Sequence, residues 1–275
     1  MNIQTITKIL IDAGIEVNEA KREIKMLLEH LFNYTELDRI KGLELSETNL
    51  TLLKEKVQER IEKRIPIQYL IGQAWFMGEY FKVTPDVLIP RDETELLVKR
   101  VIDIINQNGF EDVLDIGTGS GCIACTIAKC TSSTVLGVDI SSDALRVALD
   151  NVTKLGINNK AIFRKSNLFE RIRDGEIFDI IISNPPYIPI GTDLSPEVQK
   201  EPALALFAGE NGLEFYRKII EQAPNYLNSE GYLIFELGIS ESSAVKLMME
   251  KDFKNIKIEK DLAGIDRIIY GQKKV

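Results

Sequence analysis

The residues best suited to chemistry lie in two short segments, each of which follows an apolar run. One segment, Asp115 to Gly121, reads DIGTGSG, and the other, Ser183 to Tyr187, reads SNPPY. Glycines at alternate positions let the backbone approach a ligand closely and adopt positive φ. Prolines fix φ and hold the preceding residue in an extended conformation. The first segment therefore predicts a ligand cradle, and the second predicts rigidly held hydrogen-bond acceptors.

The acceptors of the second segment suit an exocyclic NH2 group. The Asn184 side-chain oxygen and the Pro185 carbonyl can both accept from one such group, and Tyr187 offers a flat face to a planar substrate. The nitrogen lone pair of an amide or aromatic amine is delocalised. Two acceptors that bind the N–H groups would increase the electron density on nitrogen and orient its lone pair. We therefore predict N-methylation, with Asn184, Pro185 and Tyr187 catalytic and Pro186 also contacting substrate. A rigid turn without chemistry is the competing interpretation.

The glycine segment alone leaves the cofactor open. Asp139 ends the next predicted strand, where a carboxylate can accept both hydrogen bonds of a ribose diol, although a strand end or helix cap would also place an aspartate there. Gly119 to Ala124 also fits the dinucleotide pattern G-x-G-x-x-A. These features suit S-adenosylmethionine and NAD equally well. The SNPPY segment favours S-adenosylmethionine, with S-adenosylhomocysteine as product.

Alternating strand and helix patterns run from Asp112 to the end of the chain. Buried strands are expected at 112–116, 134–139, 161–163, 178–183 and 231–237, with helices at 121–129, 142–155 and 212–227. This alternation predicts an α/β fold with a mostly parallel sheet covered on both faces. Strands at 254–259 and 266–270 have no helix between them, so they must form an antiparallel hairpin.

The N-terminal half has a different character. Up to about Arg64 the apolar residues recur at helical spacing, which predicts a small helical bundle. Residues 66–90 are rich in aromatic and β-branched types and indicate a β-hairpin connector. We predict domains at 1–85 and 86–275. One helix has a basic end, which we interpret as solvated and compatible with the helix dipole; it comprises Lys56, Arg60, Lys63 and Arg64.

Composition narrows the function classes. The 275 residues are 44% hydrophobic and 28% charged, and they contain neither a membrane-spanning apolar run nor a signal-peptide pattern, so we expect a cytoplasmic protein. The net charge of −8 disfavours stable nucleic-acid binding. The single histidine, His30, and the clustered Cys122, Cys125 and Cys130 do not suggest a metal site, so no metal is expected.

With these motifs in place, nearly the whole chain resembles the bacterial release factor glutamine N5-methyltransferases. Two further segments carry the resemblance: Val87 to Glu95, VLIPRDETE, and Glu201 to Leu206, EPALAL, which Gly209 follows. The resemblance implies a Rossmann-like class I methyltransferase fold that modifies the glutamine of the Gly-Gly-Gln motif in class-1 release factors. It also implies that the helical half grips the release factor, and we expect a monomer. The implied cofactor contacts are Gly117, Thr118, Gly119, Ser120, Gly121, Asp139, Asn167, Leu168 and Asn184.

The chain departs from the family pattern at three places. Asp92 stands where proline is usual, Asn167 stands where an acidic residue is usual, and Ser240-Glu241 stands where a glutamine often occurs.

Three alternative functions remain open. The first is a nucleic-acid methyltransferase acting on adenine N6 or guanine N2, which would need base flipping or a single strand. The others are an NAD-dependent oxidoreductase and a catalytically silent binding module.

Overall fold

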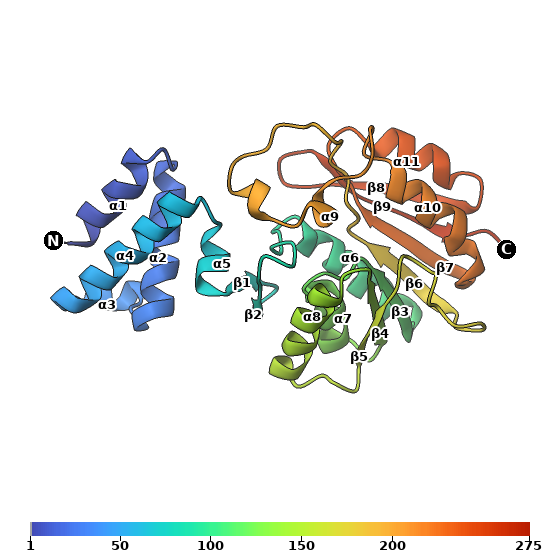
Figure 1. Ribbon diagram of the computed structural model, residues 1–275. Coiled ribbons are helices and arrows are strands. Elements are labelled where there is room, and N and C mark those ends of the chain that lie inside the picture. Colours follow the sequence, from blue (N-terminus) through green and yellow to red (C-terminus); the bar gives the residue numbers. More distant parts are fainter. Residues whose placement is uncertain (1) are drawn as a thin grey trace. The chain divides into compact units, whose positions relative to one another are not determined.

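The computed structural model describes residues 2–275, which form two compact units (Figure 1). The first unit contains the chain up to Gly72 together with Leu194–Lys200, and the second contains Gln73–Asp193 and Glu201–Val275. The division after Gly72 differs from the predicted boundary near residue 85. The reason is the hairpin of β1 (Gln73–Phe76) and β2 (Glu79–Lys82), whose Phe76 and Phe81 are buried in the core of the second unit.

The first unit is the expected helical bundle. Its helices are α1 (Ile3–Asp12), α2 (Val17–Phe32), α3 (Glu36–Ile40), α4 (Glu47–Lys63) and α5 (Ile67–Ile71). Local sequence explains the helix starts, because Asn2, Thr35 and Ser46 each accept a hydrogen bond from a backbone N–H in the first helical turn. The apolar faces meet in one core that includes Ile6, Leu10, Ile24, Leu27, Leu53 and Val57.

The basic end of α4 is not wholly solvated, so that interpretation was wrong for Arg60. This side chain is only 1% exposed, and it donates to Glu23 and Glu197 over 2.9 Å each. Arg64 also pairs with Glu197, at 2.8 Å. A buried guanidinium needs such partners because desolvating an unpaired charge is very costly. Glu197 therefore ties Leu194–Lys200, distant in sequence, into the first unit.

The second unit is built on a seven-stranded sheet in the order β5-β4-β3-β6-β7-β9-β8. Five strands are parallel: β3 (Asp112–Ile116), β4 (Thr134–Asp139), β5 (Ala161–Lys165), β6 (Phe178–Ser183) and β7 (Leu227–Glu236). The last two, β8 (Phe253–Lys260) and β9 (Asp266–Lys273), pair antiparallel with each other, and β9 pairs antiparallel with β7. The predicted mostly parallel sheet and its C-terminal antiparallel hairpin are confirmed.

Helices cover both faces of this sheet (Figure 1). One face packs against α6 (Thr94–Asn108), α7 (Cys122–Cys130) and α8 (Ser142–Leu155), and the other against α10 (Glu214–Gln222) and α11 (Ser242–Met249). A short helix, α9 (Ala203–Leu206), precedes α10. Alternate residues of β6 point to opposite faces of the sheet. Ile180 and Ile182 pack in the core beneath α6, α7 and α8, and Ile181 packs in the core beneath α10 and α11. The sheet is thus buried on both sides, as its apolar strands predict.

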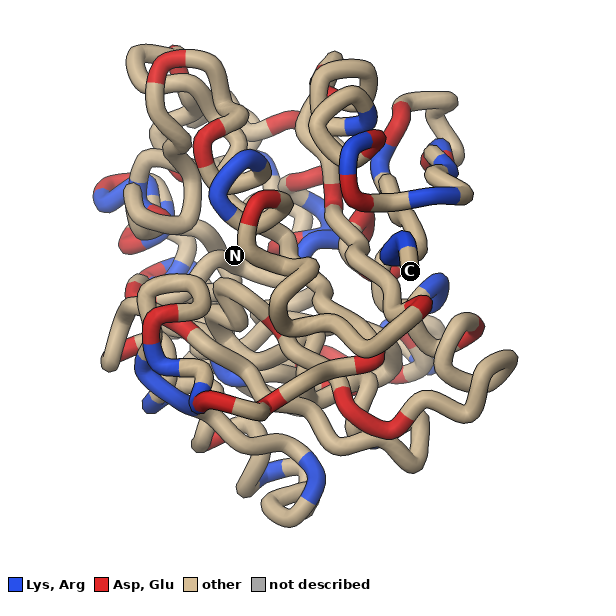
Figure 2. Tube along the Cα trace, turned by 90° about the vertical axis from the view of Figure 1, so that its right-hand side faces the viewer, with Lys and Arg blue, Asp and Glu red and all other residues tan. Residues whose placement is uncertain are grey.

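The parallel strands bring the candidate segments to one edge of the sheet. Ile116, the last residue of β3, pairs with Val138 near the end of β4 and with Ser183 at the end of β6. Lys and Arg residues are interspersed with Asp and Glu along the trace (Figure 2). Among the helices of residues 2–275, none is both long enough and apolar enough to cross a bilayer.

Candidate active site

The glycine segment forms a tight turn between β3 and α7. Gly117, Gly119 and Gly121 all have positive φ, at 75°, 54° and 77°. Added Cβ atoms would find open space at Gly117 and almost none at Gly121, where Phe163 Cζ would lie 2.9 Å away. The first two glycines line a cavity, whereas the third allows α7 to approach Phe163 and α8. The three glycines therefore serve two different purposes.

Two polar residues of this turn point inward. Thr118 and Ser120 are buried, and Thr118 Oγ1 donates to Asp115 Oδ2 over 2.6 Å. Burial raises the pKa of Asp115 to about 7, and the Thr118 bond lowers it only partly. Of the residues expected to contact the cofactor, Thr118, Ser120 and Gly121 are absent from the cavity lining. In the structure they support the turn.

Asp139 lies beside the glycine turn at the end of β4. Its Oδ2 accepts from the Gly119 N–H at 2.9 Å, and its Oδ1 accepts from the Ser141 N–H at 2.8 Å. Burial raises the pKa of this carboxyl, and the backbone hydrogen bonds oppose the increase. A carboxylate has about four acceptor positions, so these bonds leave acceptor capacity for a ligand hydroxyl. Asp139 lines the same cavity as Gly117 and Gly119.

That cavity has a volume of about 280 Å³, near the lower end of the range for small-molecule sites. It brings together many of the residues that the sequence singled out: Gly117, Gly119, Asp139, Asn167, Leu168, Asn184, Pro185 and Pro186. It also contains residues that sequence reasoning missed, among them Leu88, Ile140, Ala144, Leu204, Phe215, Lys218 and Ile219. Phe215 and Ile219 could have been identified from the sequence, because they are four positions apart on α10 and such residues share a helix face.

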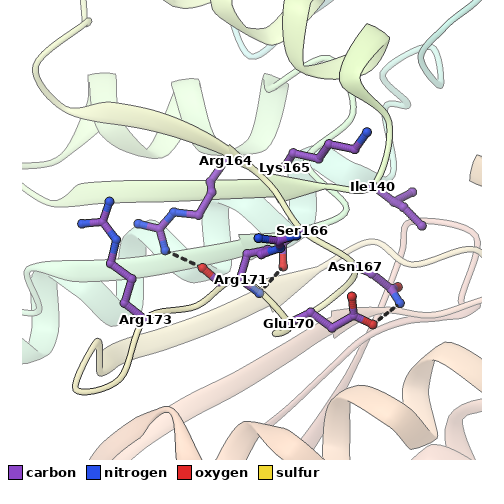
Figure 3. Close-up of a pocket in the computed structure, with 8 residues that line it drawn as sticks. All are labelled: Ile140, Arg164, Lys165, Ser166, Asn167, Glu170, Arg171 and Arg173. Atoms are coloured by element: carbon purple, nitrogen blue, oxygen red, sulfur yellow. Dashed lines mark hydrogen bonds between the residues drawn. The ribbon is translucent and has the colours of Figure 1, made fainter.

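Asn167 and Leu168 lie at one end of the cavity, after β5. The Asn167 side-chain NH2 donates to Glu170 over 2.6 Å, and Figure 3 shows these two side chains pointing toward each other. The loop is held by Ser166, whose hydroxyl donates to the Leu168 carbonyl and accepts from the Arg171 N–H. A wider hollow of about 750 Å³ adjoins this end and shares Ile140, Ser166 and Asn167 with the cavity. Glu170 lines the hollow and not the cavity, and it holds the Asn167 amide by this hydrogen bond.

The SNPPY segment closes the other side. Ser183 donates to the Ile116 carbonyl over 2.7 Å and so joins the ends of β6 and β3. Asn184 Nδ2 donates to Thr94 Oγ1 over 3.3 Å, and the Asn184 side chain also lies near enough to Glu236 to lower the pKa of that carboxyl. Thr94 in turn donates to Glu236 Oε2 over 2.6 Å. Asn184 and Pro185 line the cavity together with Gly117 and Asp139, as the two motifs predicted.

Tyr187 is held beside this cavity and does not line it. Its ring packs so closely on Gly238 that an added Cβ there would lie 2.8 Å from Tyr187 Cδ2. At Gly212 an added Cβ would lie 2.4 Å from the Tyr187 carbonyl oxygen. Burial raises the pKa of the Tyr187 hydroxyl well above its usual value, so the phenol is neutral at physiological pH. Gly238 therefore fixes the position of the Tyr187 ring, and Gly212 allows the close approach of the Tyr187 backbone.

The remaining two motifs meet each other. The buried Glu201 accepts from the Ile89 N–H over 3.1 Å and forms an ion pair with Arg91. At the far end of the Val87–Glu95 segment, Glu95 accepts from the Met77 N–H over 2.9 Å. Both motifs thus build the wall around the SNPPY segment. Residues 2–275 contain no group of three or more His, Cys, Asp or Glu arranged to hold a metal.

Comparison with known proteins also ends the N-terminal domain at residue 72. Residues 3–72 match the PrmC N-terminal domain family, and residues 108–273 match a methyltransferase domain family. Solved structures with a similar fold include a methyltransferase from Pyrococcus furiosus, with a TM-score of 0.54 at 19% identity over 73% of this chain and 91% of that one. A 16S rRNA N2 methyltransferase from T. Thermophilus gives 0.55 at 18% identity, over 74% of this chain and 50% of that one.

Curated relatives extend the match to the full length. The release factor glutamine methyltransferase of Bacillus subtilis is 38% identical over 97% of both chains. That of Thermodesulfovibrio yellowstonii is 36% identical over 94% of this chain and 95% of its own. These matches confirm the resemblance carried by the four sequence motifs: the chain belongs to the release factor glutamine methyltransferase family.

Proposed function

We propose that this protein transfers a methyl group from S-adenosylmethionine to the side-chain amide nitrogen, N5, of the Gly-Gly-Gln glutamine in class-1 peptide release factors. The observation that carries the proposal is the shared cavity of the glycine turn, Asp139, Asn184 and Pro185. The residues of the proposed cofactor cradle and of the proposed amide acceptors line one cavity. The names of the full-length relatives support the substrate.

The residues present fit the cofactor. Gly117 and Gly119 offer open space where any side chain would intrude, and Asp139 keeps acceptor positions for a ribose diol. Asn167, oriented by Glu170, and Leu168 would contact the adenine. When bound, S-adenosylmethionine supplies an electrophilic methyl group and leaves as S-adenosylhomocysteine.

The chain contributes position and electrostatics. Asn184 Oδ1 and the Pro185 carbonyl accept hydrogen bonds from the glutamine NH2, which orients the nitrogen lone pair and increases its electron density. The buried surroundings strengthen these bonds because the local dielectric constant is low. The amide nitrogen gains the methyl carbon and releases one proton to solvent water. Tyr187, held on Gly238 beside the cavity, would offer its flat ring to the planar amide.

The remaining roles concern partners and location. The first unit would bind the release factor, and the exposed apolar side chains on and after α3, Leu37, Ile40 and Leu43, suit such a contact. We further propose that the protein acts as a monomer in the cytoplasm, where translation termination takes place. Its net charge of −8 and interspersed charges favour a protein substrate over a nucleic acid (Figure 2).

A labelling experiment tests this function. The purified protein is incubated with methyl-labelled S-adenosylmethionine and one of four acceptors: release factor, its Gly-Gly-Gln Gln→Ala variant, single-stranded DNA or RNA. We expect label only in the release factor that retains the glutamine. Label in nucleic acid would establish the alternative amino-methyltransferase, and label in the Gln→Ala variant would refute the assigned target. Asn184→Ala should abolish transfer while cofactor affinity changes little.

A further inference from the structure

We propose that Thr94 and Glu236 are positioning residues that hold the Asn184 amide with its oxygen toward the cavity and its NH2 away from it. This inference rests on the proposed function, because a methyl acceptor amide needs that oxygen. The three residues form a hydrogen-bond chain, Asn184 to Thr94 to Glu236, at the meeting point of β6, α6 and β7. Thr94 and Glu236 lie outside both the glycine turn and the SNPPY segment.

The chain is short and well protected. Thr94 is 3% exposed and Glu236 is 2% exposed. Thr94 Oγ1 donates to Glu236 Oε2 over 2.6 Å and accepts from Asn184 Nδ2 over 3.3 Å. The Asn184 side chain also lies near enough to Glu236 to lower the pKa of that carboxyl. Because Thr94 and Glu236 are shielded from water, each hydrogen bond fixes the orientation of the next side chain.

Hydrogen-bond polarity sets the direction of the amide. An ionised glutamate can only accept, so Thr94 must give its single proton to Glu236. The Thr94 oxygen then has only lone pairs left for Asn184, and Glu236 likewise can only accept. Both contacts therefore require the Asn184 NH2 group. A flipped amide would place its oxygen against two acceptors, and this repulsion keeps Oδ1 on the cavity side.

Protonation of Glu236 would remove this constraint. Burial raises its pKa to about 7, while Thr94, Arg267 and Asn184 lower it and Glu93 adds to the increase. Tyr187 and Cys122 also face this carboxyl, and burial raises both their pKa values so far that they stay neutral near pH 7. Protonated Glu236 can donate, so the flipped amide becomes tolerable. The fraction of correctly oriented Asn184 should fall as the pH drops through about 7.

The first arm of the test needs no substrate. The Asn184 side-chain NH2 signals of the 15N-labelled full chain are assigned by their loss in Asn184→Asp. We expect them to titrate with a midpoint near 7 in the wild type and to stop titrating in Glu236→Gln. The titration should persist in Glu241→Gln, although burial raises the pKa of Glu241 to about 7 as well. Glu230→Gln, on the exposed part of β7, is the matched surface control.

The second arm measures release factor methylation. Thr94→Val should lower kcat by about tenfold or more, a loss typical of removing a partner behind a functional group, whereas Thr94→Ser should restore most of it. The affinity for S-adenosylmethionine should change less than about twofold, because neither residue lines the cavity. In the wild type kcat should increase with pH around 7, and in Glu236→Gln it should be low and flat.

The two arms separate the inference from the proposed function. Asn184 signals that do not titrate, or that titrate equally in Glu236→Gln, would overturn the positioning role even if methylation proceeds. Full kcat in Thr94→Val would do the same. If the signals behave as expected but the wild type labels no release factor, the orientation stands and the assigned substrate fails.

Discussion

The glycine turn permits a sharp test, because its first and third glycines have similar backbone angles and different surroundings. Gly117 and Gly121 have φ values of 75° and 77°. An added methyl group at Gly117 meets nothing within 4 Å, whereas at Gly121 it would lie 2.9 Å from Phe163 and 3.0 Å from Ala148. We expect Gly117→Ala to impair cofactor binding and Gly121→Ala to impair stability.

The magnitudes follow from two separate penalties. Left-handed backbone costs a residue with a Cβ about 1–2 kcal/mol, and both variants incur this. Overpacking a close-packed interior adds about 1–3 kcal/mol, and only Gly121→Ala incurs that as well. The expected loss of unfolding free energy is therefore about 2–5 kcal/mol at Gly121 and about 1–2 kcal/mol at Gly117. The methyl group at Gly117 enters the cradle and should weaken cofactor affinity about tenfold or more, a change of about 1.4 kcal/mol.

Gly156→Ala provides the matched control. Gly156 follows α8 with φ at 70° and has nothing within 4 Å of an added Cβ, so it isolates the backbone penalty. Unfolding is followed by scanning calorimetry of the full chain, and cofactor affinity by titration calorimetry. A Gly121→Ala variant no less stable than Gly156→Ala would refute the packing argument. Unchanged cofactor affinity in Gly117→Ala would refute its place in the cradle.

Four other outcomes follow from the same structure. The folded state raises the pKa of Asp115 from 3.8 to about 7, so it binds the proton more tightly than the unfolded state. The stability that Asp115 contributes is therefore full at low pH and declines up to about pH 7, so by calorimetry Asp115→Asn, which cannot ionise, should gain stability relative to the wild type over that window. Arg60→Ala should cost about 3–5 kcal/mol in thermal unfolding, because it leaves buried Glu23 unpaired; a loss below about 1 kcal/mol would contradict this. Ile40→Ser, at a side chain 72% exposed, should increase KM for release factor without changing kcat or the melting temperature, and an unchanged KM would exclude this contact. Asp139→Asn should weaken cofactor binding about tenfold or more by titration calorimetry, since it loses acceptor positions, and equal affinity would remove its ribose role.

Local patterns predicted the framework because the sheet is buried on both faces. The helix expected at 142–155 forms at Ser142–Leu155, where Ser141 caps its start and Gly156 ends it in the left-handed region. The strands expected at 112–116 and 178–183 are found as β3 and β6. For these elements the apolar periodicity and the flanking turn residues lie within one short segment, so that segment alone is enough to predict the helix or strand.

Long-range polar contacts could not be predicted in this way. Thr94 and Glu236 are 142 positions apart, and no periodic pattern links them. Arg60 looked like an exposed helix end, yet Glu197, 137 positions away, makes its burial possible. Thr118 and Ser120 belong to the right motif, but their side chains turn inward. A motif identifies which backbone approaches a ligand, whereas the direction of each side chain depends on partners that the fold supplies.

Buried carboxylates give the family motifs a common physical role. Glu201 fixes the Val87–Glu95 segment through Ile89 and Arg91, and Glu236 fixes Asn184 through Thr94. Burying a carboxyl in this way does not maximise stability, because its desolvation opposes folding. Its ionised form is, however, an acceptor only, so it sets the polarity of the hydrogen bonds that it receives. An apolar wall could hold the SNPPY backbone equally well, but it could not decide which end of the Asn184 amide faces the substrate.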